Sequence, residues 1–264
     1  MGIRGLGRDR IIGPRPATPR INPVGSCRVQ VSGHLSGKDA VGPPLAIFAC
    51  FNRNVSEDAM PDETSTTTDL FEIMRTTRSM RRLKPDPVPN ELIRKILEAG
   101  VCAPSGGNMQ RWRFLVIKDA AIKKAVGAYY KRAWDEQVGP RYRNRFLRLL
   151  DAAEYLAAHI HEAPIWIVPC LEGGTPTRTS GSSIYPAVQN MLLAARALGL
   201  GATLTTLYLG FEKEAEAALG LPDGVHSYAI IPVGYPMGRF GPVRRVALSD
   251  VVYEDRWGQP YRDL

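Results

Sequence analysis

Residues 78–82 form the first segment whose side chains could do chemistry. They read Arg-Ser-Met-Arg-Arg, so guanidinium groups stand beside a hydroxyl. Arg78 and Ser79 suit a phosphate dianion, and Arg81 or Arg82 suits the electron-rich edge of a ring. A basic helix end stabilised by the helix dipole is the alternative interpretation of this segment.

A second candidate segment covers residues 104–112 and reads Pro-Ser-Gly-Gly-Asn-Met-Gln-Arg-Trp. Its glycines allow the backbone to approach a ligand, and Asn108 and Gln110 offer amide donors and acceptors. An ordinary turn contains similar residues, so this segment is not decisive alone. The two segments together predict a site for the phosphate and the ring of a flavin, because a flavin nucleotide needs both kinds of contact.

The elements that must position these segments follow from hydrophobic spacing and capping residues. The spacing predicts helices over 70–74, from Asn90 up to Pro104, and over about 120–135, 142–161, 183–198 and 211–219. It predicts strands over 113–118, 165–168, 202–208 and 227–234, with a polar loop over 173–182. Thr68 or Asp69 is the expected cap of the first helix, and Asn90 that of the second. Helices that interleave with strands predict a mixed sheet flanked by helices.

The expected helix over 183–198 is almost entirely apolar and is therefore predicted to be central. Gln189 and Asn190 stand within it, and buried amides require hydrogen-bond partners. Gly199 and Gly201 follow directly and are expected to end the helix.

Residues 1–62 differ in composition from the rest of the chain. They contain many glycines and prolines and no sustained hydrophobic period that would bury a face. We expect a disordered N-terminal extension here, or an upstream stretch from a misplaced start codon, with one folded domain over 63–264. A functional tail is the alternative, although no binding motif is present in it.

The formal net charge of +8 raises the question of a nucleic-acid partner. Residues 1–62 hold 8 basic and 5 acidic groups and the remainder holds 26 and 21, so neither part is strongly basic. No run of Lys and Arg is interleaved with aromatic residues, so we expect no nucleic-acid partner. Anionic small molecules account for the surplus of positive charge.

The cysteines and histidines indicate a protein of the reducing cytoplasm without a metal site. The four cysteines are widely spaced and form no C-x-x-C pair, and Cys102 and Cys170 are expected to be small buried hydrophobes. His159 and His161 are two apart on an expected helix, so they point to different faces and cannot chelate one ion. The apolar run over 45–51 is too short to span a membrane, and no secretory signal pattern precedes it.

The two chemical segments resemble those of the nitroreductase superfamily of FMN-dependent oxidoreductases. Members carry an Arg-Ser-x-Arg segment and then a loop of the type Pro-Ser-x-x-Asn-x-Gln-x-Trp, and the similarity here runs from about residue 67 to residue 253. Arg111 stands where many members have a proline before the tryptophan. The resemblance implies that FMN is bound by residues of both segments: Arg78, Ser79, Met80, Arg81 or Arg82, Pro104, Ser105, Gly106, Asn108 and Gln110.

Two later segments extend the resemblance. Residues 199–206 resemble the segment that reaches the flavin, where Leu204 lies beside the ring and Thr205 or Thr206 meets atom N5. Gly-Tyr-Pro at 234–236 leads to Arg244 and Arg245, one of which would complete the phosphate site. The glycines at 199 and 201 do not form a dinucleotide-binding fingerprint, because they follow a helix and precede a strand.

The resemblance implies an α+β fold with a mixed, mainly antiparallel sheet flanked by helices, assembled as a two-fold homodimer with FMN at the interface. It implies that electrons pass from NADH or NADPH through FMN to a nitroaromatic, quinone or enone in a two-step, ping-pong reaction, without a catalytic side chain as nucleophile. A deazaflavin reductant remains open. Three alternatives remain open as well: a reductive dehalogenase resembling iodotyrosine deiodinase, a non-catalytic flavin-binding protein, and a structural α+β protein without flavin.

Overall fold

The fold is known from a computed structural model that describes residues 68–142 and 148–263. The expected N-terminal extension, with Cys27 and Cys50, lies outside the described residues. The helices are α1 (Leu70–Thr76), α2 (Asn90–Val101), α3 (Ala120–Ala133), α4 (Gly139–Tyr142), α5 (Arg148–His159), α6 (Arg178–Ala197) and α7 (Glu212–Ala218). A π-helical turn covers Trp134–Val138, and 3-10 turns cover Gly106–Asn108, Ile160–Glu162, Leu207–Phe211 and Leu248–Asp250.

The sheet consists of β1 (Trp112–Ile117), β2 (Ile165–Glu172), β3 (Gly201–Ala202), β4 (Val225–Ser227) and β5 (Ile231–Gly234). The order is β1-β2-β5-β3, and β4 pairs with the carboxyl end of β2. Each pairing among the described strands is antiparallel. This confirms the expected mainly antiparallel α+β sheet, whose central strand is β2.

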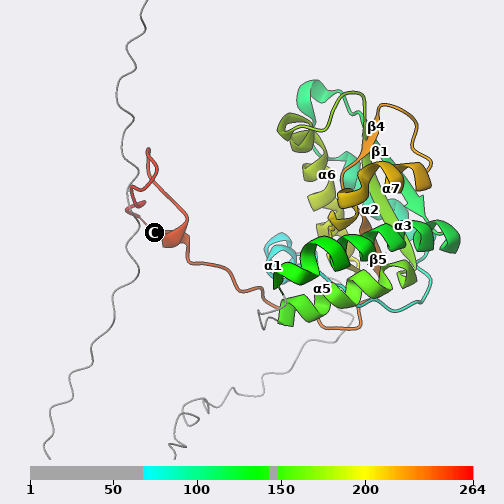
Figure 1. The fold of residues 1–264 in the computed structure, drawn as a ribbon. Helices are drawn as coiled ribbons and strands as arrows, with labels where there is room; N and C mark the ends of the chain where they lie inside the picture. The colour runs from blue at the N-terminus through cyan, green and yellow to red at the C-terminus, as the bar shows by residue number, and fades with distance from the viewer. Residues whose placement is uncertain (1–67, 143–147, 264) are drawn as a thin grey trace, which may run out of the picture. The chain divides into compact units, whose positions relative to one another are not determined.

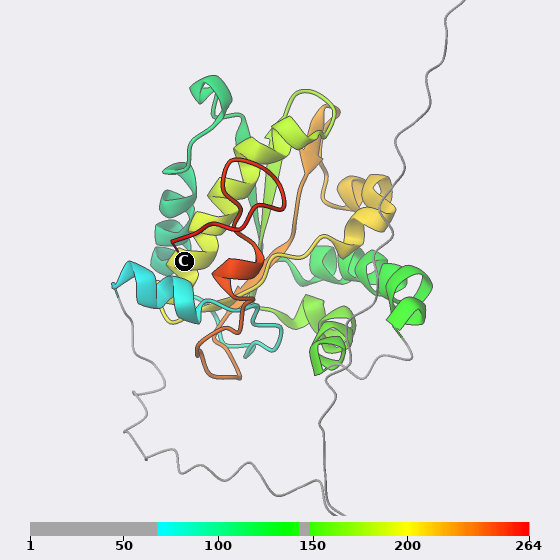
Figure 2. The ribbon, with the colours of Figure 1, turned by 90° about the vertical axis from the view of Figure 1, so that its left-hand side faces the viewer.

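Helices cover both faces of the sheet, and the alternation of β2 shows why (Figures 1 and 2). Successive side chains of a strand point to opposite faces. Ile165 and Ile167 belong to a core that includes residues of α2 and α6. Trp166 and Val168 belong to a second core that includes residues of α3, α5 and α7. Seven of the eight residues of β2 are buried, as expected for a strand covered on both sides.

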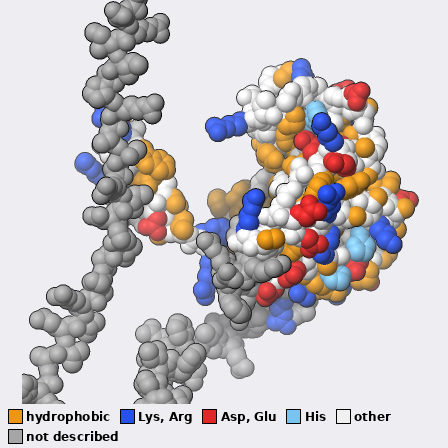
Figure 3. Space-filling model, viewed as in Figure 1, with side chains coloured by type: hydrophobic (Ala, Val, Ile, Leu, Met, Phe, Trp, Pro, Cys, Tyr) orange, Lys and Arg blue, Asp and Glu red, His pale blue; other side chains and the backbone are white. Residues whose placement is uncertain are grey.

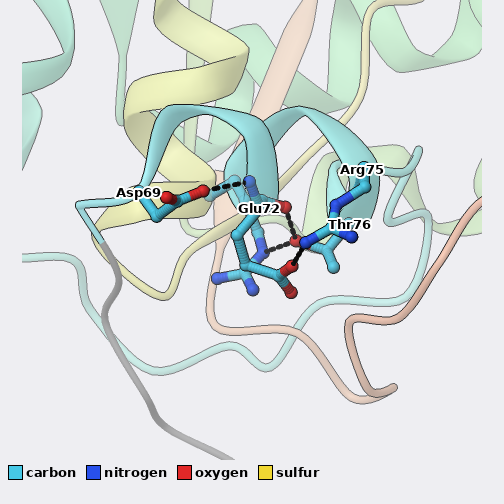
Figure 4. Close-up of polar contacts among 5 residues, drawn as sticks. Asp69, Glu72, Arg75 and Thr76 are labelled. Carbon is cyan, nitrogen blue, oxygen red and sulfur yellow. Dashed lines mark hydrogen bonds and ion pairs between the residues drawn. The ribbon is translucent and has the colours of Figure 1, made fainter.

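The first helix is held at its start and at its end (Figure 4). Asp69 caps α1 as expected, because its carboxylate accepts a hydrogen bond from the Glu72 N–H at 2.6 Å. At the other end, the Thr76 hydroxyl donates to the Glu72 carbonyl and accepts a hydrogen bond from Arg196 Nε at 2.9 Å. Arg196 lies in α6, so α1 is fixed to the long helix on its face of the sheet.

Several local predictions are wrong. Asn90 does not cap α2, because Pro89 holds the cap position and the Asn90 side chain accepts a hydrogen bond from Lys118. The expected loop over 173–182 ends early, since Thr177 and Ser180 form a capping box that starts α6 at Arg178. The strand expected over 202–208 is confined to Gly201–Ala202.

Beyond β3 the chain leaves the sheet after one further contact. Thr205 forms a single bridge to Ile230, and a 3-10 turn follows it.

Cys170 is buried as expected, but Cys102 is exposed where α2 ends, so its predicted burial is wrong. No helix in the described part of the chain is long and apolar enough to cross a lipid bilayer.

Candidate active site

A cavity of about 230 Å³ lies between the end of α1, the middle of α6 and the end of β3. We call it the arginine cavity. Arg78 and Ser79, which follow α1, line this cavity together with Arg245 from far along the chain. The complete lining is Met74, Thr77, Arg78, Ser79, Gln189, Leu192, Ala202, Thr203 and Arg245.

The segment over 78–83 reaches this cavity because it lies directly against β3. Met80 N–H donates to the Ala202 carbonyl at 3.0 Å, and Leu83 forms a bridge to Pro236. Gly201 makes the approach possible, since a Cβ there would lie 2.9 Å from Met80 Cβ and 2.9 Å from Leu83 Cδ2. A distance that short does not occur between real side chains, so only glycine fits here.

The charge of the arginine cavity favours an anion. Two guanidinium groups reach it, and no carboxylate stands among its described lining residues. Ser79 and Thr203 add hydroxyl groups and Gln189 adds an amide, so each polar lining side chain can donate a hydrogen bond. A phosphate dianion fits this donor set, because charge-assisted hydrogen bonds from arginine are the strongest that a protein offers it.

Gln189 and Thr203 were not predicted as site residues. Gln189 was expected to be buried with a partner, yet it is exposed and lines the cavity, whereas Asn190 donates to the Ala99 carbonyl at 3.1 Å as expected. The available signal was a polar residue within an apolar helix. Thr203 lies within the segment 199–206, but only Leu204, Thr205 and Thr206 of that segment were predicted to contact the flavin.

The rest of the basic segment points elsewhere. Met80 is buried. Arg82 is exposed and its guanidinium lies 4.1 Å from the centre of the Tyr155 ring. Arg81 is half-buried near Tyr130, and burial lowers the pKa of its guanidinium while Tyr130 acts in the opposite direction. Of the two arginines left open for the ring edge, Arg81 therefore stands beside the threonine segment described next.

Thr205 is held in place by three hydrogen bonds. Its N–H and carbonyl pair with Ile230 at 3.0 and 2.9 Å, and its hydroxyl lies 2.7 Å from the Tyr130 hydroxyl. Burial raises the pKa of the Tyr130 phenol, and the Thr205 hydrogen bond and Arg81 oppose this rise. Leu204 and Thr206 on either side are exposed. Thr205 is thus the better-positioned of the two expected N5 partners.

The loop over 104–110 is tightly turned. The Ser105 hydroxyl accepts a hydrogen bond from Gln110 N–H at 3.1 Å, and the side-chain oxygen Oδ1 of Asn108 accepts one from Gln110 Nε2 at 3.1 Å. Asn108 and Gln110 have positive φ values of 52° and 49°. Residues other than glycine seldom adopt this region, and such backbone conformations are concentrated at binding sites.

This loop does not line the arginine cavity of its own chain. Ser105, Gly106 and Gln110 line a second cavity of about 280 Å³, together with several residues from the stretch 171–183. Neither cavity is lined by Pro104, Asn108 or Arg244. The Arg244 carbonyl accepts a hydrogen bond from Arg245 Nη1 at 2.9 Å. Within one chain, six predicted residues are therefore divided between two cavities, and the other predicted residues line neither of them.

Comparisons with known proteins identify the family of this chain. The profile of the nitroreductase family matches residues 74–235. An NADH dehydrogenase of Thermus thermophilus is 34% identical over 197 residues, which cover 66% of this chain and 90% of that protein. An iodotyrosine deiodinase of Thermotoga neapolitana is 29% identical over 169 residues, which cover 63% of this chain and 88% of that protein.

Solved structures share the fold. The crystal structure of an iodotyrosine deiodinase bound to FMN and 3-iodo-L-tyrosine aligns with a TM-score of 0.59 and 28% identity, over 71% of this chain and 98% of that chain. The family profile covers more than half of the chain and includes every strand of the sheet. The chain therefore belongs to the nitroreductase family and is an oxidoreductase.

Proposed function

We propose that this protein binds FMN and passes electrons from NADH or NADPH to an electron-poor organic acceptor such as a nitroaromatic, a quinone or an enone. The arginine cavity is the observation that carries the proposal. Its two arginines, the hydroxyls of Ser79 and Thr203 and the amide of Gln189 form the donor set that the phosphate of FMN requires, while the Thr77 hydroxyl donates to the Ile73 carbonyl. When bound, FMN supplies the hydride and electron transfer.

The residues of the chain bind and orient in this proposal. Arg78 and Arg245 neutralise the phosphate, and Ser79 donates a hydrogen bond to it. Arg81 stabilises negative charge at the pyrimidine edge of the ring. A half-buried guanidinium remains charged, and solvent screens its electrostatic attraction to the ring less than it would at an exposed site. Thr205, fixed by Tyr130 and Ile230, offers a hydrogen-bond partner to N5.

The two groups of predicted residues are proposed to meet in a two-fold homodimer. Ser105, Gly106 and Gln110 lie at a cavity of their own, so they would reach FMN bound by another copy of the chain. The strained Asn108 and Gln110 backbone supports this role, because strain of this kind persists where a ligand or a partner uses it.

The test is spectroscopic. The full chain is purified with FMN, titrated anaerobically with NADH and with NADPH while flavin absorbance is followed, and then given menadione or a nitrofuran. We expect bleaching by a nicotinamide and recovery by the acceptor. A yellow protein that no reductant bleaches would be a non-catalytic flavin-binding protein, and a colourless protein that ignores FMN would contradict the whole proposal.

A second candidate is reductive dehalogenation, supported by the deiodinase relatives. A zwitterionic substrate needs free charged groups above the ring. Lys131 and Glu136 are the candidates for these groups, but Lys131 pairs with Asp135 and Glu136 with Arg132, each at a spacing of four residues. These ion pairs favour the first candidate. Release of iodide from 3-iodo-L-tyrosine by the reduced protein would favour the second.

A further inference from the structure

A group of metal-ligating side chains lies on the α7 side of the sheet, apart from the arginine cavity. Glu212 and Glu216 of α7 and His226 of β4 bring one ligand atom each to within 4.8 Å of one another. His226 Nδ1 is 3.4 Å from Glu216 Oε2 and 4.0 Å from Glu212 Oε1. We call these residues the α7–β4 cluster.

The fold aims these three side chains at one point. Glu212 and Glu216 are four residues apart, so they share one face of α7. His226 stands in β4, opposite Leu171 of β2. Glu216 Oε1 accepts hydrogen bonds from the N–H and the hydroxyl of Ser227 at 2.6 and 2.9 Å, which leaves Oε2 directed toward the imidazole. Orienting contacts of this kind typically support the ligands of a metal.

Two polar atoms in or beside the cluster make no hydrogen bond of normal geometry within the described residues. His226 Nδ1 is buried and has no hydrogen-bond partner in the described structure. The Tyr208 side chain is 0% exposed, and its hydroxyl makes no hydrogen bond of normal geometry there, although Ser227 lies close enough to act on it. Tyr208 belongs to the same core as Ala215 of α7.

An ordinary ion pair explains the geometry less well. Two carboxylates at a spacing of four residues repel each other, and this repulsion destabilises a helix. A protonated imidazole at 3.4 and 4.0 Å from them makes no hydrogen bond through Nδ1. A small divalent ion bonded to both oxygens and to Nδ1 would offset the repulsion and satisfy the nitrogen at the same time.

We infer that Glu212, Glu216 and His226 bind a divalent transition-metal ion, with Zn²⁺ as the best match, that ties α7 to β4. Imidazole nitrogen and carboxylate oxygen bind Zn²⁺ at about 2.0–2.2 Å, so two ligands of one tetrahedral ion lie about 3.3 Å apart. The observed separation of 3.4 Å meets this value, and that of 4.0 Å requires a small side-chain movement. Water completes the coordination.

Solvent can deliver the ion. The side chains of Glu212 and His226 are 41% and 31% exposed, and Glu216 is 12% exposed. Figure 3 shows acidic side chains at the surface in the region of α7 and β4. The role we assign to the ion is structural. It would brace the 3-10 turn Leu207–Phe211, which directly follows Thr206 and directly precedes α7.

Calorimetric titration of the full chain with Zn²⁺, after removal of metal by a chelator, tests this inference. We expect one ion per chain and a rise in the melting temperature. Glu212→Gln and His226→Asn should each weaken Zn²⁺ binding about 30-fold or more, because each removes a ligand. Glu216→Gln also alters the Ser227 contacts and is expected to disturb folding, so the more exposed Glu212 carries the test.

The matched control is His159→Asn. His159 forms a histidine–glutamate pair with Glu162 at 2.8 Å, but among the described residues it does not belong to a group of three metal-ligating side chains. Its loss should leave Zn²⁺ affinity unchanged, and so should Cys102→Ser, which removes an exposed thiol. Equal Zn²⁺ affinity in the native protein, Glu212→Gln and His226→Asn would overturn the inference, as would the absence of saturable binding. The result is independent of FMN.

Discussion

The arginine cavity and the α7–β4 cluster lie on opposite faces of the same sheet and select opposite charges. The cavity joins two guanidinium groups with neutral donors, whereas the cluster joins two carboxylates with an imidazole. The cavity is built from residues as far apart as 78 and 245, and the cluster from residues 212–226. The first therefore depends on long-range packing and the second on one helix turn and one strand.

The difference predicts that damage to one region will spare the other. The contacts that hold the cavity run through β3, Gly201 and the α1–α6 junction. The contacts that hold the cluster run through Ser227 and the pairing of β4 with β2. Substitutions can therefore test each region separately, with the opposite region as an internal control.

The largest expected effect is on FMN affinity. Arg78→Ala with Arg245→Ala should weaken FMN binding about 100-fold or more, because each hydrogen bond to a charged group contributes about 1.5–3 kcal/mol. Flavin fluorescence titration measures this. Arg94→Ala is the matched control, since Arg94 is an exposed arginine that pairs with Glu98 on its own helix. Equal losses in the control and the double variant would contradict the cavity's role.

The next effect is on packing at β3. Gly201→Ala should lower the free energy of unfolding by about 1–3 kcal/mol, because the new Cβ meets Met80 and Leu83 and the segment over 78–83 must move. FMN affinity should fall with it, whereas Zn²⁺ affinity should not. Urea denaturation gives the first quantity. Gly238→Ala, where nothing lies within 4 Å of the added Cβ, should change stability by less than about 0.5 kcal/mol.

The sequence allowed the cavity to be predicted in part. Arg78 and Ser79 stand in one short motif and Arg245 follows a second, so local spacing and family resemblance found them. Gln189 and Thr203 reach the same cavity only because α6 packs beside β3. A local sequence pattern does not predict this packing. The pairing of residues 104–110 with this cavity depends on a second chain and stays a prediction.

The cluster was not predicted for a similar reason. The two glutamates form a visible i, i+4 pair, but His226 meets them only through the turn that returns the chain to β2. His159 and His161 are close in the sequence, but their spacing excludes chelation. The three residues of the α7–β4 cluster lie on a helix and a strand, and no local spacing connects them. At Asn90 a local pattern predicted a contact that does not form. Asn90 is a favourable capping residue, but Pro89 occupies the cap position and the Asn90 side chain accepts a hydrogen bond from Lys118 instead.

A smaller effect distinguishes two buried tyrosines, one beside each region. Tyr130→Phe removes the hydrogen bond to Thr205 and should lower the free energy of unfolding by about 1 kcal/mol. Tyr208→Phe removes a hydroxyl without a described partner and should be neutral or slightly stabilising in metal-free protein. Thermal and urea unfolding of both variants measure the contrast. A larger loss in Tyr208→Phe would show that its hydroxyl is bonded.

The smallest expected effect concerns Cys170, whose side chain faces the α7 side of the sheet. Burial, with a contribution from Glu216, raises the pKa of this thiol to about 12. The thiolate is the reactive form, so Cys170 should remain unmodified by iodoacetamide at pH 8 in the folded protein, whereas exposed Cys102 should react.

Peptide mapping by mass spectrometry reads both sites, and the same reaction in urea should modify both. Folding raises the pKa of the Cys170 thiol from about 9 to about 12. The contribution of this thiol to the free energy of unfolding is therefore fully present below about pH 9 and is lost as the pH rises toward 12. Rapid labelling of native Cys170 at pH 8 would mean that the sheet opens on its α7 side. The α7–β4 cluster would then lack the rigid support that the metal-site inference assigns to it.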